Sequence, residues 1–211
     1  MPWLMATFYD WGMATTERAC LARWRRDLLS DLHGRVLEVG AGTGASLDCY
    51  PPGLDELVLA EPDPSMHTKL ERRARQRPNT RIVQASIETL GPDVGLFDAV
   101  FLSLVLCSVR RPADALAKLA GLLKPGGQLV FLEHVVARDH ARRRWQRRAE
   151  PVWKRVMGNC HLTRDTEEEI RAAGFEFEML ERESMRRAIP LVRPTVRGRA
   201  RKSQAPLAAE P

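Results

Sequence analysis

The sequence predicts an α/β fold, a mostly parallel sheet of seven strands with helices on both faces. Short apolar stretches alternate with amphipathic ones, as is typical of strands joined by crossover helices. The stretch 99–104 is apolar apart from Ser103, as expected for a strand covered on both faces. A chain of 211 residues with 44% hydrophobic and 28% charged residues suits one compact domain, and these values exclude a disordered chain or a fibrous rod.

The expected elements follow from periodicity and from turn residues. Strands are expected at 35–40, 57–61, 81–85, 99–104, 128–133, 175–180 and 195–201. A first helix is expected over 15–32, because its apolar residues share one face, and Gly34 would end it.

Capping residues mark the start of later helices. Asp63 and Pro64 supply an N-cap and a first-turn proline for one helix, and Pro112 opens another. An Arg-rich helix follows, with an apolar stripe at Trp145, Ala149, Val152 and Val156, and Pro151 would kink it. Asp165 and Glu168 have capping-box spacing ahead of the last helix.

The formal net charge of +6 is concentrated in two stretches. One begins at Arg138 and ends at Arg148, and the other covers 186–202. The rest of the chain carries a net charge of −6. Such stretches are most often solvated faces, although a membrane surface or another anionic partner would also suit them.

Neither a targeting signal nor a membrane-spanning segment is expected from the sequence. The longest apolar run, 99–107, is far shorter than the ~20 residues that cross a bilayer. The first residues show neither a basic region nor a cleavage site. Cys20, Cys49, Cys107 and Cys160 form no C-x-x-C pair, so reduced thiols and a cytoplasmic location are expected.

A glycine loop follows the first expected strand, where an open α/β sheet binds ligands. Gly40, Gly42 and Ala45 formally satisfy the nicotinamide fingerprint, so dehydrogenase chemistry has to be weighed. Glu38 lies two residues before the loop and would repel a pyrophosphate, whereas it would favour a cationic ligand. Together with Glu61, which suits a ribose diol, the loop therefore favours a sulfonium-bearing ligand.

These residues resemble class I S-adenosylmethionine-dependent methyltransferases, which have a Rossmann-like fold. Glu38-Val39-Gly40-Ala41-Gly42-Thr43-Gly44 is similar to their motif I. A closer resemblance, over residues 9–200, is to the alkyl thiol S-methyltransferases of the methyltransferase-like group. The matching words are YPPG at 50–53, LVLCSV at 104–109, LEHV at 132–135, PVW at 151–153, CHLTR at 160–164 and LVRP at 191–194. One departure is Glu61, where that group usually has Asp.

The resemblance implies which residues bind S-adenosylmethionine. Glycines of the loop would hold the methionine part, Glu61 the ribose, Ser86 and Ile87 would border the adenine, and Leu104 would lie under the methyl donor. Glu38 would support the loop. The full set expected to bind the cofactor is Glu38, Gly40, Ala41, Gly42, Gly44, Glu61, Pro62, Ser86, Ile87 and Leu104.

Methyl transfer needs alignment and exclusion of water more than it needs catalytic side chains. For a thiol acceptor the remaining task is to favour the thiolate, and His134 at the end of the fifth strand is the best-placed base. The alternative is that His134 only hydrogen-bonds the loop. The residues expected to contact the acceptor are Tyr9, Trp11, Glu133, Trp153 and Cys160.

No metal is expected, because Cys160 and His161 have no further ligands at suitable spacing in the sequence. Nucleic-acid methylation is disfavoured, because Ser103-Leu104-Val105-Leu106 stands where base methyltransferases carry an N/D-P-P-Y/W-like word. The sequence is also compatible with N- or O-methylation of a phospholipid head group, quinone or natural product. A non-enzymatic hypothesis is a basic module that binds nucleic acid or a membrane surface through 138–148.

One methyltransferase domain is expected over 1–202. Residues 1–33 would form an N-terminal lid or helix, and 138–163 an Arg-rich insertion on the acceptor side. The tail at 203–211 is expected to be disordered.

Overall fold

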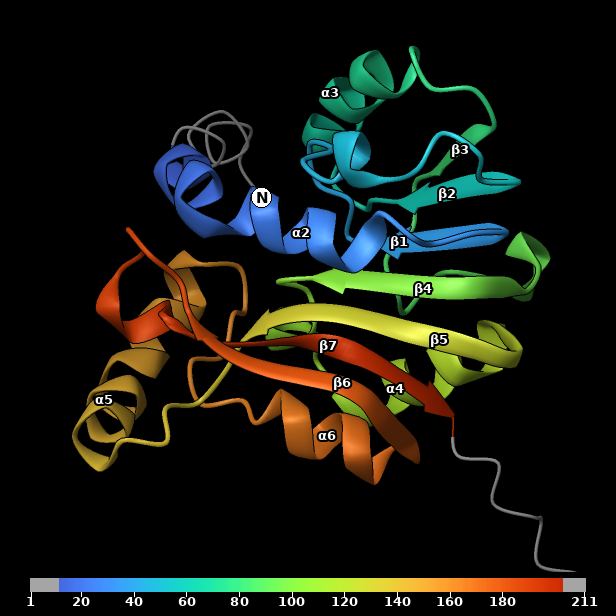
Figure 1. Ribbon diagram of the computed structural model, residues 1–211. Helices are drawn as coiled ribbons and strands as arrows, with labels where there is room; N and C mark the ends of the chain where they lie inside the picture. Colours follow the sequence, from blue (N-terminus) through green and yellow to red (C-terminus); the bar gives the residue numbers. More distant parts are fainter. Residues whose placement is uncertain (1–11, 203–211) are drawn as a thin grey trace, which may run out of the picture.

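The computed structural model describes residues 12–202, which form one seven-stranded sheet (Figure 1). The strands are β1 (Arg35–Val39), β2 (Glu56–Ala60), β3 (Thr80–Val83), β4 (Phe97–Ser103), β5 (Leu123–His134), β6 (Phe175–Ser184) and β7 (Pro194–Lys202). Their spatial order is β3-β2-β1-β4-β5-β7-β6. The pairs among β1 to β5 are parallel, and β7 is antiparallel to both neighbours. The predicted mostly parallel sheet of seven strands is confirmed.

Helices cover both faces of this sheet, as predicted. They are η1 (Glu17–Leu21), α2 (Ala22–Leu29), α3 (Pro64–Ala74), α4 (Pro112–Leu122), α5 (His140–Val156) and α6 (Thr166–Ala172). Short 3-10 turns are η2 (Leu47–Cys49), η3 (Pro92–Val94), η4 (Leu106–Ser108) and η5 (Pro190–Val192). Adjacent residues of β1 face opposite cores: Val36 packs with α2 and α3, and Leu37 with α4 and α6.

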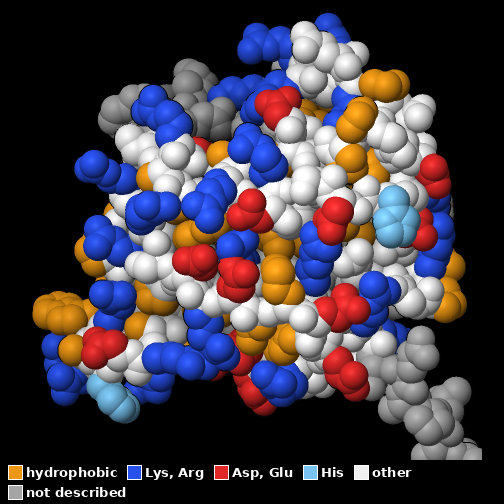
Figure 2. Space-filling view, viewed as in Figure 1, with side chains coloured by type: hydrophobic (Ala, Val, Ile, Leu, Met, Phe, Trp, Pro, Cys, Tyr) orange, Lys and Arg blue, Asp and Glu red, His pale blue; other side chains and the backbone are white. Residues whose placement is uncertain are grey.

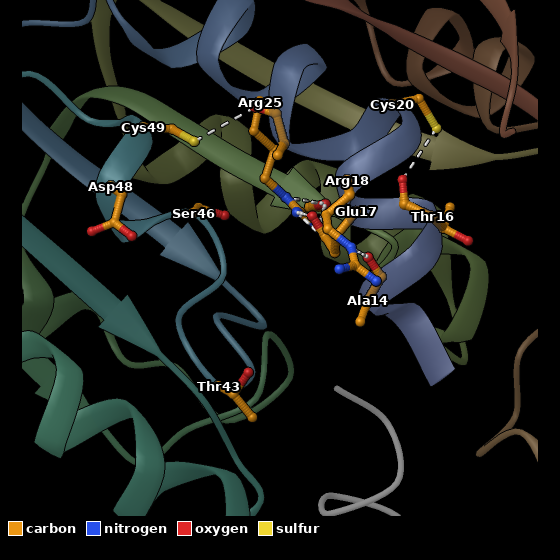
Figure 3. Close-up of polar contacts among 12 residues, drawn as sticks. Ala14, Thr16, Glu17, Arg18, Cys20, Arg25, Thr43, Ser46, Asp48 and Cys49 are labelled. Atoms are coloured by element: carbon orange, nitrogen blue, oxygen red, sulfur yellow. Dashed lines mark hydrogen bonds and ion pairs between the residues drawn. The ribbon is translucent and has the colours of Figure 1, made fainter. Parts of the chain in front are cut away.

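A π-helical turn interrupts the expected first helix. Residues 12–29 are helical, and η1 lies inside this stretch, ahead of α2. The buried guanidinium of Arg25 donates to Glu17 at 2.6 Å and to the Ser103 hydroxyl at 3.3 Å. Figure 3 shows Arg25 reaching from α2 toward Glu17. These contacts fasten the N-terminal helix to the end of β4.

Several strand boundaries differ from those expected. β6 continues to Ser184, because its pairing with β7 extends past the apolar stretch that sequence periodicity detects. β5 begins at Leu123, five residues before the expected start of this strand at Gln128. β3 ends at Val83 rather than at Ala85.

The apolar stripe of α5 faces solvent. Trp145, Val152 and Val156 are 62%, 67% and 59% exposed, whereas Gln146 is fully buried. Figure 2 shows basic and apolar side chains together at the lower left, where Figure 1 places α5. None of the helices in the described part of the chain combines the length and the apolar character needed to cross a membrane.

Three arginines of the second basic stretch, all on β7, are paired with acids of neighbouring elements. Arg199 donates to Asp31 at 2.8 Å, and Arg201 pairs with Glu178. The hydrogen bond from Arg199 lowers the pKa of Asp31. Arg197 lies 3.5 Å from Asp27. The positive charge of β7 is therefore balanced locally.

Candidate active site

A cavity of about 690 Å³ opens at the carboxyl ends of β1, β2, β4 and β5. This is the edge at which open parallel sheets bind ligands. Ten of the expected site residues line it: Gly40, Gly42, Glu61, Pro62, Ser86, Ile87, Leu104, His134, Trp153 and Cys160. Tyr9 and Trp11 lie outside the described residues, as does the tail from 203.

Gly40 and Gly42 serve the loop in different ways. The loop is anchored to β2, because the Gly40 amide donates to the Ala60 carbonyl at 2.8 Å. At Gly40 (φ +69°) an added Cβ would lie 2.5 Å from Val105 Cγ2, so the missing side chain makes room for Val105. At Gly42 (φ +58°) the only atom within 4 Å of an added Cβ is Met66 Sδ, at 3.9 Å. Gly42 therefore leaves open space on the cavity wall that a side chain would fill.

Glu61 connects the loop to β2 from inside the cavity. Its carboxylate accepts the Gly42 amide at 2.8 Å and the Asp63 amide at 2.9 Å. Burial raises the pKa of Glu61, and the two amides oppose this rise. Each carboxylate oxygen can accept a second hydrogen bond, so Glu61 can still accept hydrogen bonds from the hydroxyls of a ribose.

Three of the expected cofactor residues lie behind the cavity wall rather than in it. Glu38 is buried and accepts hydrogen bonds from the hydroxyls of Ser46 and Tyr50, both at 2.8 Å. Ala41 packs in the core. A Cβ on Gly44 would lie 2.7 Å from Leu47 Cδ1, so this glycine serves packing. These residues support the loop from behind, and the expectation that Ala41 and Gly44 face the ligand is corrected.

Leu104 has an unusual backbone conformation where β4 meets the cavity. Its φ is +59°, a region that residues other than glycine rarely adopt. The Leu104 amide donates to the Leu132 carbonyl at 2.9 Å, and this bond holds the residue in place. Strain of this kind gathers at functional sites, where the surrounding structure enforces it.

Glu133 caps the turn that follows Leu104. Its carboxylate accepts the amides of Val105, Leu106 and Cys107 at 2.8, 3.0 and 3.4 Å. The side chain is fully buried and is not part of the cavity wall, so the expected contact with the acceptor is wrong. Successive residues of a strand point to opposite faces, and in β5 it is His134 that reaches the cavity.

His134 belongs to a cluster that the sequence did not reveal. Its Nε2 lies 2.9 Å from Cys160 Sγ, and Cys160 Sγ lies 3.9 Å from Cys107 Sγ. The Trp153 indole donates to Cys160 Sγ at 3.3 Å. The hydrogen bond with Cys107, followed by the contacts with His134 and Trp153, lowers the pKa of Cys160, while the pKa of Cys107 is raised. The expectation that Cys160 has no further ligand-type residues nearby is therefore corrected.

Comparison with known proteins agrees with this geometry. A family described as a methyltransferase domain matches residues 37–131. The thiol S-methyltransferase TMT1B of Rattus norvegicus is 36% identical over 193 residues, which cover 85% of this chain and 77% of the relative. TMT1A of Homo sapiens is 32% identical over 193 residues, which cover 85% and 79%. The N-methyltransferase NodS of Bradyrhizobium japonicum WM9, solved with S-adenosyl-L-homocysteine, has a TM-score of 0.67 at 20% identity, and the match covers 90% of this chain and 88% of NodS.

The fold and the loop thus define an S-adenosylmethionine-dependent methyltransferase of class I. Within that class, the chain belongs to the family of the thiol S-methyltransferases TMT1A and TMT1B. Its cofactor is S-adenosylmethionine, which supplies an electrophilic methyl group on a sulfonium. The open space at Gly42 suits the binding of this cofactor, and the carboxylate oxygens of Glu61 can accept hydrogen bonds from its ribose.

The Gly42→Val variant is expected to lose cofactor binding. A β-branched residue is strained at φ +58°, and its side chain would project into the cavity. At 100 times its Kd, S-adenosylhomocysteine should stabilise the wild type by about 2.7 kcal/mol, and its effect on the variant should vanish. Thermal shift measures both. Gly53→Val is the control, because this exposed glycine has no atom near an added Cβ. A normal shift in Gly42→Val would contradict the assignment.

The Glu133→Gln variant should change the pH dependence of stability. Burial raises the pKa of Glu133 to about 7, so between about pH 4.3 and 7 the folded chain binds more protons than the unfolded chain. The contribution of Glu133 to the free energy of unfolding is therefore greatest at low pH and is lost as the pH rises through 7. Urea titrations from pH 5 to 8 should show the free energy of unfolding of the wild type falling relative to the variant.

The matched control is Glu56→Gln. Hydrogen bonds from Arg35 and Arg81 outweigh the effect of burial and lower the pKa of Glu56. The contribution of Glu56 to the free energy of unfolding is therefore constant from pH 5 to 8. The plot of this free energy against pH should run parallel for Glu56→Gln and the wild type. Parallel curves for Glu133→Gln as well would show that Glu133 does not titrate in this range.

Proposed function

We propose that the protein transfers the methyl group of S-adenosylmethionine to the sulfur of a small lipophilic thiol. The observation that carries this proposal is the continuity of the cavity. One end is formed by Gly42 and Glu61, and the same cavity extends to His134 and Cys160. The names of the TMT1A and TMT1B relatives support a thiol as the acceptor.

The walls beyond the loop favour an apolar acceptor. Met13, Trp153, Met157, Met185 and Val192 line this part. Such walls exclude water and hold a ligand through its apolar surface. Because the leaving group is a neutral thioether, alignment of the acceptor is the main task left to these residues.

The acceptor's proton would leave at the wall that holds His134. The Nε2 of His134 is already in contact with Cys160 at 2.9 Å. Its Nδ1 is buried and without a hydrogen-bond partner among the described residues. The role of His134 as a base therefore stays a prediction, and the geometry favours a cluster that acts as a unit.

The proposed environment is the cytoplasm. Cys20, Cys49, Cys107 and Cys160 are free thiols, which suits a reducing compartment. We do not expect nucleic acid as a partner, and the local pairing of the β7 arginines with acids supports this view.

Peripheral contact with an anionic membrane is proposed for α5. The stretch from Arg138 to Arg148 overlaps the exposed apolar stripe of α5, which consists of Trp145, Val152 and Val156. The Arg148 guanidinium lies 5.7 Å from the centre of the Trp145 ring. Basic residues beside exposed apolar ones are typical of helices that lie at a membrane interface.

Two assays test these proposals. In the first, labelled S-adenosylmethionine is offered with an alkyl thiol, a phenol, an amine and a demethylated quinone. The thiol should be methylated, with turnover at least about tenfold above that of the other acceptors, as the transition-state discrimination of a pocket allows. Gly42→Val should give no product. Faster methylation of any other acceptor would contradict the thiol proposal.

In the second assay, vesicles of anionic phospholipid should bind the protein, and neutral vesicles should not. Trp145→Ala combined with Val152→Ala should reduce binding by about tenfold, because two exposed apolar anchors are lost. Leu96→Ala is the control, because Leu96 is an exposed apolar residue outside α5. Equal binding to both vesicles, or no effect of the double variant, would reject the membrane contact.

A further inference from the structure

Three metal-binding side chains converge on the acceptor end of the cavity. Cys107 comes from η4, His134 from the end of β5, and Cys160 from the segment after α5. Their ligand atoms all lie within 4.8 Å of one another, and all three residues are buried. All three also line the cavity. No acidic surface group takes part, so the cluster is unlike the exposed carboxylates that often gather without an ion.

The donor set suits zinc. Two thiolates and one imidazole form one of the ligand sets of catalytic zinc, in which a fourth position stays open. A tetrahedral ion with Zn–S bonds of ~2.3 Å places two sulfurs about 3.8 Å apart. The separation between Cys107 Sγ and Cys160 Sγ is 3.9 Å. The contact of 2.9 Å between His134 and Cys160 would have to widen by about 0.6 Å to admit the ion.

The surroundings also suit a divalent ion. Two thiolates balance its charge, so the buried site would be neutral. The indole of Trp153 donates to Cys160 Sγ, as outer residues around metal sites do. Within residues 12–202, nothing supplies His134 Nδ1 with the outer hydrogen bond that most metal-bound histidines make. The affinity should therefore be weaker than that of a closed structural site.

We propose that Cys107, His134 and Cys160 bind a zinc ion whose open position receives the sulfur of the acceptor. The role of the acceptor rests on the proposed thiol methylation. Zinc binding releases the two cysteine protons to solvent. The acceptor thiol binds the ion and loses its proton to water, so it is a thiolate at neutral pH.

Methyl transfer then replaces one bond between carbon and sulfur with another. The acceptor's sulfur forms a bond to the methyl carbon, while the bond from that carbon to the sulfonium breaks. The electron pair of the broken bond stays with the departing sulfur, which becomes a neutral thioether. The methylated product is also a neutral thioether and a poor zinc ligand, so it can leave. In this arrangement His134 holds the metal and does not act as the base.

Metal content tests the site directly. The full chain is incubated with Zn²⁺, desalted and analysed for metal, and Co²⁺ replaces Zn²⁺ as a probe of tetrahedral thiolate coordination by absorbance. The wild type should retain about one ion per chain with thiolate-to-cobalt bands. Cys107→Ser and Cys160→Ser should each lose both signals. Cys20→Ser and Cys49→Ser are matched controls, because both cysteines are buried and lie outside the cluster.

Thermal shift with S-adenosylhomocysteine shows that each variant is folded, because the cofactor end of the cavity is untouched. If a cysteine variant is not folded by this measure, His134→Ala replaces it, and this variant should also lose metal binding. A wild type that retains no ion, or cluster variants that retain it as well as the controls do, would overturn the site.

Activity separates this proposal from the thiol assignment. A free thiol with pKa near 8.5 is only about 3% ionised at pH 7, so removal of zinc by a chelator should lower thiol methylation about thirtyfold at pH 7 and far less at pH 9. Equal activity with and without the ion would overturn the zinc proposal and leave thiol methylation standing. A zinc-loaded enzyme that methylates only phenols or amines would overturn the thiol assignment and, with it, the acceptor's place on the ion.

Discussion

The buried carboxylate of Glu133 holds the turn on which both ends of the cavity depend. It accepts the amides of Val105 and Leu106 at 2.8 and 3.0 Å. Within the same turn, Val105 occupies the space left by the absent side chain of Gly40, and Cys107 joins the cluster with His134. One acid at the end of β5 therefore links the shape of the cofactor loop to that of the acceptor end.

The cofactor end could be predicted from the sequence because its parts are local. The loop follows β1 directly, and Glu61 follows β2, so the parallel pairing of these strands is enough to bring them together. The direction of each loop residue could not be predicted. Ala41 and Gly44 belong to the same motif as Gly42, yet Ala41 packs in the core and Gly44 makes room for Leu47.

The acceptor end could not be predicted because its parts are distant in sequence. Cys107, His134 and Cys160 meet only after β5 pairs with β4 and the chain returns from α5. The sequence also identifies the amphipathic character of α5, but not which side is covered. The polar Gln146 is buried because its amide bonds the backbone of Ala137 at 2.8 Å and of Leu191 at 2.9 Å.

The placement of α5 has a consequence for how the acceptor arrives. Trp153 lines the cavity, while its neighbour Val152 is 67% exposed. One side of α5 therefore faces the cavity and another side faces the outside of the protein. With α5 in the proposed contact with an anionic membrane, a lipophilic compound dissolved in the bilayer would lie across this one helix from the cavity. Uptake by partitioning, rather than diffusion from bulk water, would then determine how much acceptor reaches the enzyme.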